Sequence, residues 1–140
     1  MSDFPITIYH NPDCGTSRNT LGIILAAGYD PTVIEYLHTG WSRSQLEGIL
    51  AATNLHPRDL LREKGTPAVS LGLLEATATD AEILDAMVAH PILVNRPIVI
   101  TPVGAKLTRP SEAVLSLLER KPANFTKEDG TAYLCDIHSN

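Results

Sequence analysis

Apolar and polar positions alternate at the start of the chain and then change to a helical spacing. The alternation over Ile6–Tyr9 predicts a short strand. Apolar residues recur at helical spacing over Ser17–Leu25, and we expect Gly28 to end this helix. The segment Thr32–Leu37 is β-branched and aromatic, which is typical of a second strand. A strand, a helix and a strand within this length predict a βαβ unit with two parallel strands.

The middle of the chain carries the signals that begin and end helices. Ser42–Gln45 and Thr79–Glu82 fit capping boxes, and each precedes apolar residues at helical spacing. Pro57 is well suited to the first position of a short helix, which we expect to run to Arg62. The helix that follows Thr79 should stop near His90, because Pro91 comes next. This part of the chain is therefore predicted to be a helical insertion.

The last third of the chain predicts a hairpin followed by a helix. Residues 97–101 and 105–108 flank a turn at residues 102–104, which indicates an antiparallel pair. Pro110 should open a final α-helix that runs through Leu118. The order βαβ, helical insertion, ββα predicts an α/β, thioredoxin-like fold with a mixed four-stranded sheet. We expect one domain over residues 1–140, with a polar tail from about residue 121 that is loosely held.

The composition and net charge of the chain argue against two classes of protein, nucleic-acid binders and membrane proteins. The chain has 140 residues, 44% of them hydrophobic, and a formal net charge of -5, which argues against a nucleic-acid binder. It has no apolar run long enough to cross a bilayer, and its first residues do not resemble a secretory signal. We therefore expect a cytoplasmic protein without a membrane or nucleic-acid partner. In that reducing compartment Cys14 and Cys135 should both be free thiols.

Cys14 is the leading candidate for chemistry. It lies in the loop that follows the first predicted strand and opens the first helix. A thiol is a nucleophile only as a thiolate, and a helix amino terminus favours that form. His10, Ser17 and Arg18 are close enough in sequence to add hydrogen bonds or positive charge. The alternative is a buried, inert cysteine, which a strand-to-helix loop with Gly15 next to the thiol fits poorly.

Spacing excludes two familiar thiol chemistries. A dithiol C-x-x-C motif would need a cysteine where Ser17 stands, and a phosphatase-type loop would need an arginine where Thr20 stands. Cys14 must therefore use an external thiol or reach Cys135 through a tertiary contact, and the position of Cys135 in the tail favours an incidental thiol. The histidines are spread along the chain without ligand spacing, so we expect no metal site.

Three arginines are placed where they could bind an oxyanion. Guanidinium groups bind tetrahedral oxyanions in a bidentate manner, and their charge does not titrate away. Arg62 follows a short predicted helix, while Arg96 and Arg109 bracket the predicted hairpin and can share one end of the sheet. On spacing alone, a solvated surface charge is the simpler interpretation of any one of them. For the Arg96–Pro97 peptide bond, trans is the ordinary expectation.

Four motifs, taken together, resemble one known family. The segments Tyr9–Thr20 (YHNPDCGTSRNT), Arg58–Arg62 (RDLLR), His90–Val99 (HPILVNRPIV) and Leu107–Glu112 (LTRPSE) are similar to the signatures of glutaredoxin-linked arsenate reductases. They occur in the same order and without large gaps. The resemblance runs from about Ile6 to Gly130. Each motif alone is a weak signal, whereas the ordered set is a specific one.

The resemblance implies a reaction and a set of residues. Cys14 would attack arsenate to give a thiol–arsenate adduct, with His10 supporting a low thiol pKa and Ser17 able to hydrogen-bond the thiolate. Glutathione, a co-substrate rather than a bound cofactor, would resolve the adduct. Glutaredoxin would then remove the mixed disulfide, and arsenite would leave. The arsenic oxygens would be held by Arg62, Arg96 and Arg109.

The fold class adds one expectation, and two departures limit the resemblance. In thioredoxin-like folds the proline that opens the third strand, here Pro97, is typically cis and faces the active-site cysteine. The segment Gly65–Ser70 lacks the acidic and aromatic residues expected there, which leaves the contact surface open. The tail beyond Gly130 is also unlike the family, so Cys135 inherits no role.

Two other functions remain as alternatives. One is a thioredoxin-like transcription regulator that docks on RNA polymerase; many of these carry C-x-x-C, which Ser17 removes here. The other is an oxidoreductase that uses glutathione on a different substrate. The complete set of three arginines counts against both.

Overall fold

The computed structural model describes residues 4–120, 122, 124–126 and 132–134. It divides into two compact units. Unit 1 comprises residues 1–35 and 96–140, and unit 2 comprises residues 36–95. In the described part of the chain, no helix is both long and apolar enough to cross a membrane.

The sheet of unit 1 has four strands in the order β2-β1-β3-β4. These are β1 (Thr7–Tyr9), β2 (Thr32–Ile34), β3 (Ile98–Thr101) and β4 (Gly104–Leu107). β1 pairs in parallel with β2 and antiparallel with β3, and β3 pairs antiparallel with β4. The predicted mixed sheet and its hairpin are confirmed.

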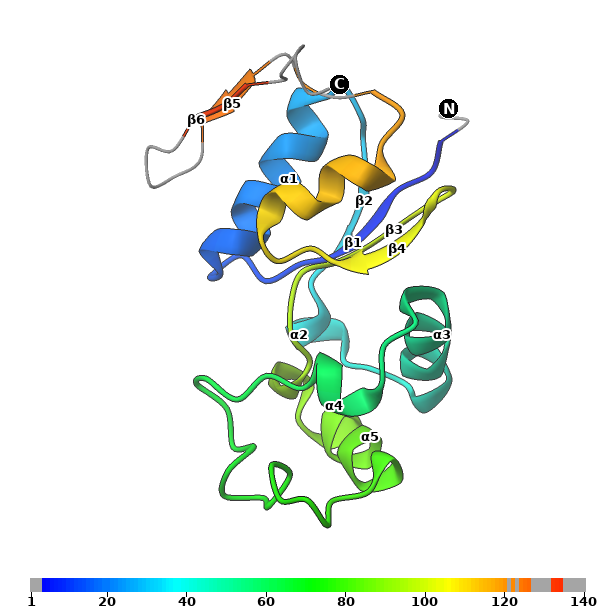
Figure 1. Ribbon diagram of the computed structural model, residues 1–140, viewed down its shortest axis with the longest axis vertical. Helices are drawn as coiled ribbons and strands as arrows, with labels where there is room; N and C mark the ends of the chain where they lie inside the picture. The colour runs from blue at the N-terminus through cyan, green and yellow to red at the C-terminus, as the bar shows by residue number, and fades with distance from the viewer. Residues whose placement is uncertain (1–3, 121, 123, 127–131, 135–140) are drawn as a thin grey trace. The chain divides into compact units, whose positions relative to one another are not determined.

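Two helical elements pack together on this sheet, α1 (Gly15–Ala26) and the 3₁₀ helix η2 (Ser111–Leu117) (Figure 1). Period-2 alternation aims Ile6 and Ile8 at this core. They join a buried cluster that includes Ile23 and Ile24 of α1, Val99 of β3, and Val114 and Leu117 of η2. Burial of these side chains anchors α1 to the sheet, and therefore fixes the end of α1 that carries Cys14.

The end of α1 matches the sequence pattern. Gly28 has a φ of +92°, a left-handed conformation that glycine adopts without steric cost. Its N–H donates to Leu25 O at 2.9 Å, which satisfies one of the last helical carbonyls.

The final helix differs from the prediction, because η2 is a 3₁₀ helix rather than an α-helix. Its buried residues are Ser111, Val114 and Leu117, which are three residues apart. In a 3₁₀ helix, side chains at i and i+3 eclipse one another, so this spacing places all three on one face.

The second strand is also shorter than predicted. It ends at Ile34, and Tyr36–Thr39 form a short helix, α2, instead of continuing the strand to Leu37. Tyr36 is 1% exposed, stacks on Trp41 with ring centroids 5.1 Å apart, and donates to Val94 O at 3.4 Å. These contacts within unit 2 override the strand preference of an aromatic residue.

Unit 2 contains α2, α3 (Arg43–Thr53), α4 (Pro57–Leu60), the 3₁₀ helix η1 (Pro91–Leu93) and α5 (Asp80–Ala89). Both predicted capping boxes, at α3 and α5, are confirmed. Pro57 occupies the start of α4, as predicted. However, α4 ends at Leu60 and does not reach Arg62, because Leu61 is extended and bridges antiparallel to Val94.

The tail contributes two short strands, β5 (Asn124–Thr126) and β6 (Ala132–Leu134), which pair antiparallel. Cys135 and the five residues after it lie outside the described residues. The expectations of one domain and of a loosely held tail therefore stay predictions.

Ser42→Ala should lower the free energy of unfolding by about 1 kcal/mol, the usual cost of losing a helix N-cap. The Ser42 hydroxyl accepts the Gln45 N–H at 3.1 Å, and the Gln45 side chain accepts the Ser42 N–H at 3.2 Å. Chemical denaturation would measure the change. Ser44→Ala, two positions further on, is the control and should cost less. An equal loss in both variants would show that the cap does not stabilise α3.

Candidate active site

Cys14 is the N-cap residue of α1. Its backbone is extended, with φ −104° and ψ 121°, and its carbonyl accepts the Arg18 N–H at 2.9 Å. An N-cap side chain points at the unpaired N–H groups of the first helical turn. The Cys14 side chain makes no capping hydrogen bond of its own, but the backbone N–H of Ser17, at the third helical position, lowers the pKa of the Cys14 thiol. The chain thus places a thiol where serine or aspartate commonly caps a helix.

Asn11 shapes the loop that leads to Cys14. Its carbonyl accepts the Cys14 N–H at 3.0 Å, and its Oδ1 accepts the Asp13 N–H at 2.9 Å. Asn11 itself is 3% exposed, although its bond to Asp13 reaches the surface, where Asp13 is exposed. This local turn fixes the backbone on the amino-terminal side of the thiol.

His10 and Ser17 form a buried pair beside the loop. The His10 Nδ1 and the Ser17 Oγ are 2.6 Å apart, and the same Oγ accepts the Asn11 N–H at 3.0 Å. Burial lowers the pKa of His10; Glu35 opposes this and Arg18 adds to it, and the net pKa lies below the ordinary value. A lowered pKa keeps His10 neutral near pH 7. Its described contact is with the Ser17 hydroxyl, so any support for the thiolate would act through Ser17.

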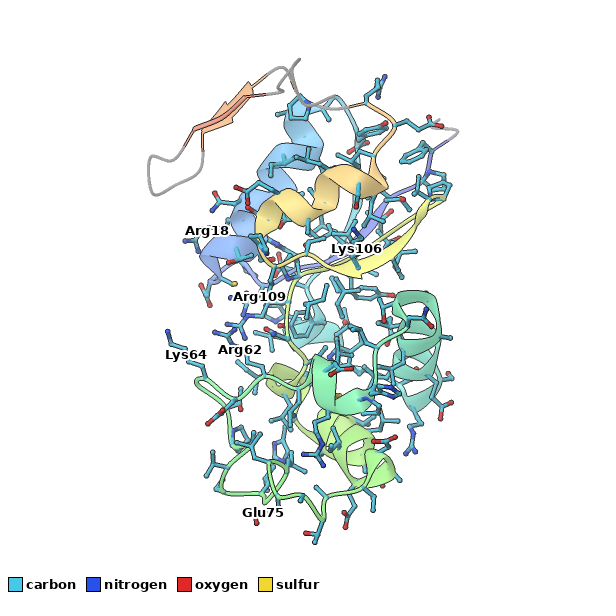
Figure 2. The ribbon with its side chains drawn as sticks, viewed as in Figure 1. Arg18, Arg62, Lys64, Glu75, Lys106 and Arg109 are labelled. Atoms are coloured by element: carbon cyan, nitrogen blue, oxygen red, sulfur yellow. The ribbon has the colours of Figure 1, made fainter. Side chains whose placement is uncertain are left out.

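Two predicted arginines meet at the sulfur. Arg109 Nη1 donates to Arg96 O at 2.9 Å and lies 3.7 Å from the Cys14 sulfur as a donor. The side chain and the positive charge of Arg96 also act on this sulfur, and both lower the pKa of the Cys14 thiol. Arg96 precedes β3 and Arg109 follows β4, so the antiparallel hairpin brings both to the end of the sheet where α1 begins. Figure 2 shows Arg109 at this end of unit 1.

These donors set the pKa of Cys14. Burial alone would raise the pKa of the thiol, because the charged form loses water. The Ser17 N–H, the side chains of Arg96 and Arg109, and the charge of Arg96 outweigh burial, and the net pKa lies below the ordinary value. The site is therefore built to hold a thiolate.

Arg18 has a different geometry from the other two arginines. Its Nη1 donates to Pro12 O at 2.7 Å, across the loop that holds Cys14 (Figure 2). It lowers the pKa of His10 but is absent from the groups that shift the pKa of Cys14. Gly15 begins α1, and a Cβ there would lie 3.8 Å from Arg18 Nη2. The roles predicted for Arg18 and Gly15 stay predictions.

Arg62 belongs to unit 2, just beyond α4. Its N–H donates to Leu93 O at 2.7 Å and its Nη1 to Asn95 Oδ1 at 3.2 Å. Asn95 in turn donates its N–H to Leu60 O at 2.8 Å. The guanidinium of Arg62 is thus oriented by the residue that immediately precedes Arg96 in the sequence.

The peptide bond between Arg96 and Pro97 is cis, as the resemblance implied and against the ordinary expectation for an X-Pro bond. The bond between Arg109 and Pro110 is also cis, which the sequence analysis did not predict. Among the described residues, no group of three His, Cys, Asp or Glu side chains could hold a metal ion.

Sequence reasoning missed several residues that shape this site. Asn11, Thr20, Asn95 and Thr108 each fix a segment that carries a candidate residue. For Asn11 a signal exists, because Asn-Pro-Asp favours a turn. For the other three the partners lie far away in the sequence, and a single chain gives no signal.

Fold and site together define a thioredoxin-like protein with one activated cysteine between arginine side chains. The ArsC family model matches residues 9–117, and the chain belongs to the ArsC family. It is 61% identical to the arsenate reductase ArsI1 of Synechocystis, over 93% of this chain and 91% of that protein. It is 53% identical to an arsenate reductase of Escherichia coli, over 94% of each chain. The solved arsenate reductase from Vibrio cholerae superposes with a TM-score of 0.79 at 36% identity, covering 84% of this chain and all of that one.

The alkylation rate of Cys14 should rise with pH through a midpoint below about 8.5, the value of a free cysteine thiol. The sign follows from the lowered pKa, since the thiolate persists to lower pH and reacts there. Arg109→Gln should move the midpoint upward, because one donor and one positive charge leave the sulfur. Arg18→Gln is the comparison and should move it less. A wild-type midpoint at or above the free value would rule out an activated thiolate.

Proposed function

We propose that this protein reduces arsenate to arsenite in arsenic detoxification, with Cys14 as the nucleophile and glutathione as the source of the second sulfur. The observation that carries the proposal is the buried thiol at the start of α1 with the Arg109 guanidinium 3.7 Å from its sulfur, and the lowered pKa of this thiol agrees with it. Family membership and the names of the relatives that match about nine-tenths of the chain support arsenate as the substrate.

In the first step, the Cys14 thiolate attacks arsenic. A sulfur–arsenic bond forms, one arsenic–oxygen bond breaks, and the oxygen leaves as water after it takes up protons. Arg109, whose guanidinium lies 3.7 Å from the sulfur, and Arg96, which lowers the pKa of the thiol, would hold the remaining oxygens. Arg62 would be the third arginine of the family pattern. Planar guanidinium groups suit this task because they bind two oxygens of a tetrahedral anion at once.

In the second step, a glutathione thiol attacks the sulfur of Cys14. A sulfur–sulfur bond forms, and the electron pair of the sulfur–arsenic bond stays on arsenic, which falls from the +5 to the +3 state. The thiol proton passes to an arsenic-bound oxygen, and arsenite leaves. Glutaredoxin would then reduce the mixed disulfide between Cys14 and glutathione.

An external thiol is favoured by what surrounds Cys14. A partner in a C-x-x-C motif would stand at position 17, where Ser17 is buried and bonded to His10 and Asn11. A hydroxyl there cannot form a disulfide. The proposed use of glutathione also places the protein in the cytoplasm, where this thiol keeps cysteines reduced.

Replacing the arginines by lysine tests the oxyanion contacts. Lysine keeps the charge but removes the planar fork, so we expect a loss in kcat/KM of roughly 10-fold or more for at least two of Arg62→Lys, Arg96→Lys and Arg109→Lys. Arg43→Lys is the matched control. Arg43 forms ion pairs with Glu47 and Asp85 on unit 2, so the Arg43→Lys variant should keep the wild-type kcat/KM. Near-native activity in all three variants would mean that these arginines do not bind arsenate.

Withholding glutaredoxin tests the electron donor. After incubation with arsenate and glutathione, intact-mass measurement should show one glutathione on the protein, lost again when glutaredoxin is added. Cys14→Ser should show no adduct and no reduction, whereas Cys135→Ser should keep most of both. If thioredoxin alone sustains full turnover without any glutathione adduct, the proposed resolving step is wrong even if arsenate is the substrate. Equal losses in both variants would point to an internal disulfide.

A further inference from the structure

Two threonine hydroxyls meet inside unit 1, next to the candidate site. Thr20 lies in the second turn of α1, and Thr108 directly follows β4. Both residues are 0% exposed, and their Oγ1 atoms are 3.4 Å apart. The sequence analysis assigned neither of them a role, although both fall within motifs of the resemblance. A buried hydroxyl without a hydrogen-bond partner would destabilise the fold, so the partners of these two hydroxyls indicate their role.

Thr108 ties together the two segments that carry the arginines. Its N–H donates to Pro97 O at 2.9 Å, and its hydroxyl donates to the same oxygen at 3.2 Å. Pro97 directly follows Arg96, and Thr108 directly precedes Arg109. The two hydrogen bonds between Thr108 and Pro97 therefore join the residues next to the two arginines. The contact extends the hairpin beyond the last strand pair, Ile98 with Leu107.

Thr20 links this node to the helix that begins beside Cys14. Its hydroxyl donates to Thr16 O at 2.9 Å, within the first turns of α1. Each hydroxyl has only one hydrogen, so the pair can make two of its three possible hydrogen bonds as donors at a time. When the bond between the two hydroxyls is one of the two, it joins α1 to the end of β4, where the Thr108 N–H also bonds to Pro97 O.

We propose that Thr20 and Thr108 form a positioning pair that holds Arg96 and Arg109 beside the Cys14 sulfur. Neither hydroxyl touches the sulfur, so the pair acts through the backbone of the arginine segments. The inference rests on the proposed function for its effect on arsenate. Its effect on the pKa of the Cys14 thiol does not depend on which substrate the protein uses, because it follows from the hydrogen bonds of the two threonines alone.

Thr108→Val tests the pair, because valine keeps the shape and volume of threonine and removes the hydroxyl. The midpoint of Cys14 alkylation against pH should rise by about half a unit or more, as the arginine donors move away from the sulfur. KM for arsenate should rise roughly three- to tenfold, with a smaller change in kcat, since the loss falls on anion contacts. Thr108→Ser, which keeps the hydroxyl, should restore both values.

Thr101→Val is the matched control. Thr101 is 7% exposed at the far end of β3, and its hydroxyl donates to Leu117 O at 2.7 Å. The variant removes a buried hydroxyl of the same hairpin away from the sulfur. It should lower stability and leave the Cys14 midpoint unchanged.

The positioning pair is refuted if Thr108→Val leaves the midpoint at the wild-type value, or if Thr101→Val shifts it equally. Should Thr108→Val fail to fold, Thr20→Val and Thr20→Ser are compared instead: the midpoint of Cys14 alkylation should rise in Thr20→Val and return to the wild-type value in Thr20→Ser. Alkylation needs no arsenate, so it separates the two proposals. A wild-type protein that reduces no arsenate refutes the proposed function, while the shift in midpoint still decides the role of the threonines.

Discussion

A thiolate that leaves water loses its hydration, and the protein must replace that hydration with donors of its own. Cys14 is 8% exposed, so this loss is large enough to raise the pKa of its thiol if nothing opposes it. The opposing groups come from two places in the chain. α1 supplies the Ser17 N–H, and the β3–β4 hairpin supplies Arg96 and Arg109. The packing of α1 and of the β3–β4 hairpin in unit 1 holds these donors at the sulfur.

The hairpin register is the constraint that places the two arginines. Ile98 pairs with Leu107 at the end of the sheet, so the residues just outside this pair are necessarily close. Ile98 and Val99 are both completely buried, but only Val99 belongs to the core cluster with α1 and η2, and a slip of one residue would remove it from that cluster. The packing of Val99 in this cluster therefore fixes the site indirectly, because it favours the register that places Arg96 and Arg109.

The sequence predicted features whose causes are local. The capping box at Ser42, the left-handed Gly28 and the strand-to-helix loop at Cys14 depend on neighbours within a few residues, and each is present in the structure. The strand predicted to Leu37 failed because Tyr36 packs on Trp41 and Val94, contacts that no local pattern reveals.

The same limit applies to the site. Cys14 was predicted from its place in a strand-to-helix loop, and the resemblance of ordered motifs then assigned roles to it and to the arginines. Neither argument gives the contacts between these residues. The Arg109 donor to the Cys14 sulfur spans 95 positions, and the Thr20–Thr108 contact spans 88. Contacts of this kind arise only when the sheet and α1 have packed, so a single sequence cannot display them.

The lowered pKa of His10 changes how the thiolate is supported. A protonated imidazole would attract the sulfur charge, but that support would vanish as pH rises through its own titration. Here burial keeps His10 neutral, and its described partner is the Ser17 hydroxyl, so it orders the loop rather than adding charge. The charges that do face Cys14 belong to arginines, which stay protonated at any pH that the protein meets. In the proposed reaction the sulfur loses its negative charge when it bonds to arsenic, while the oxygens keep theirs. Fixed guanidinium donors can then serve the oxygens without a change of protonation, which a titrating histidine could not do.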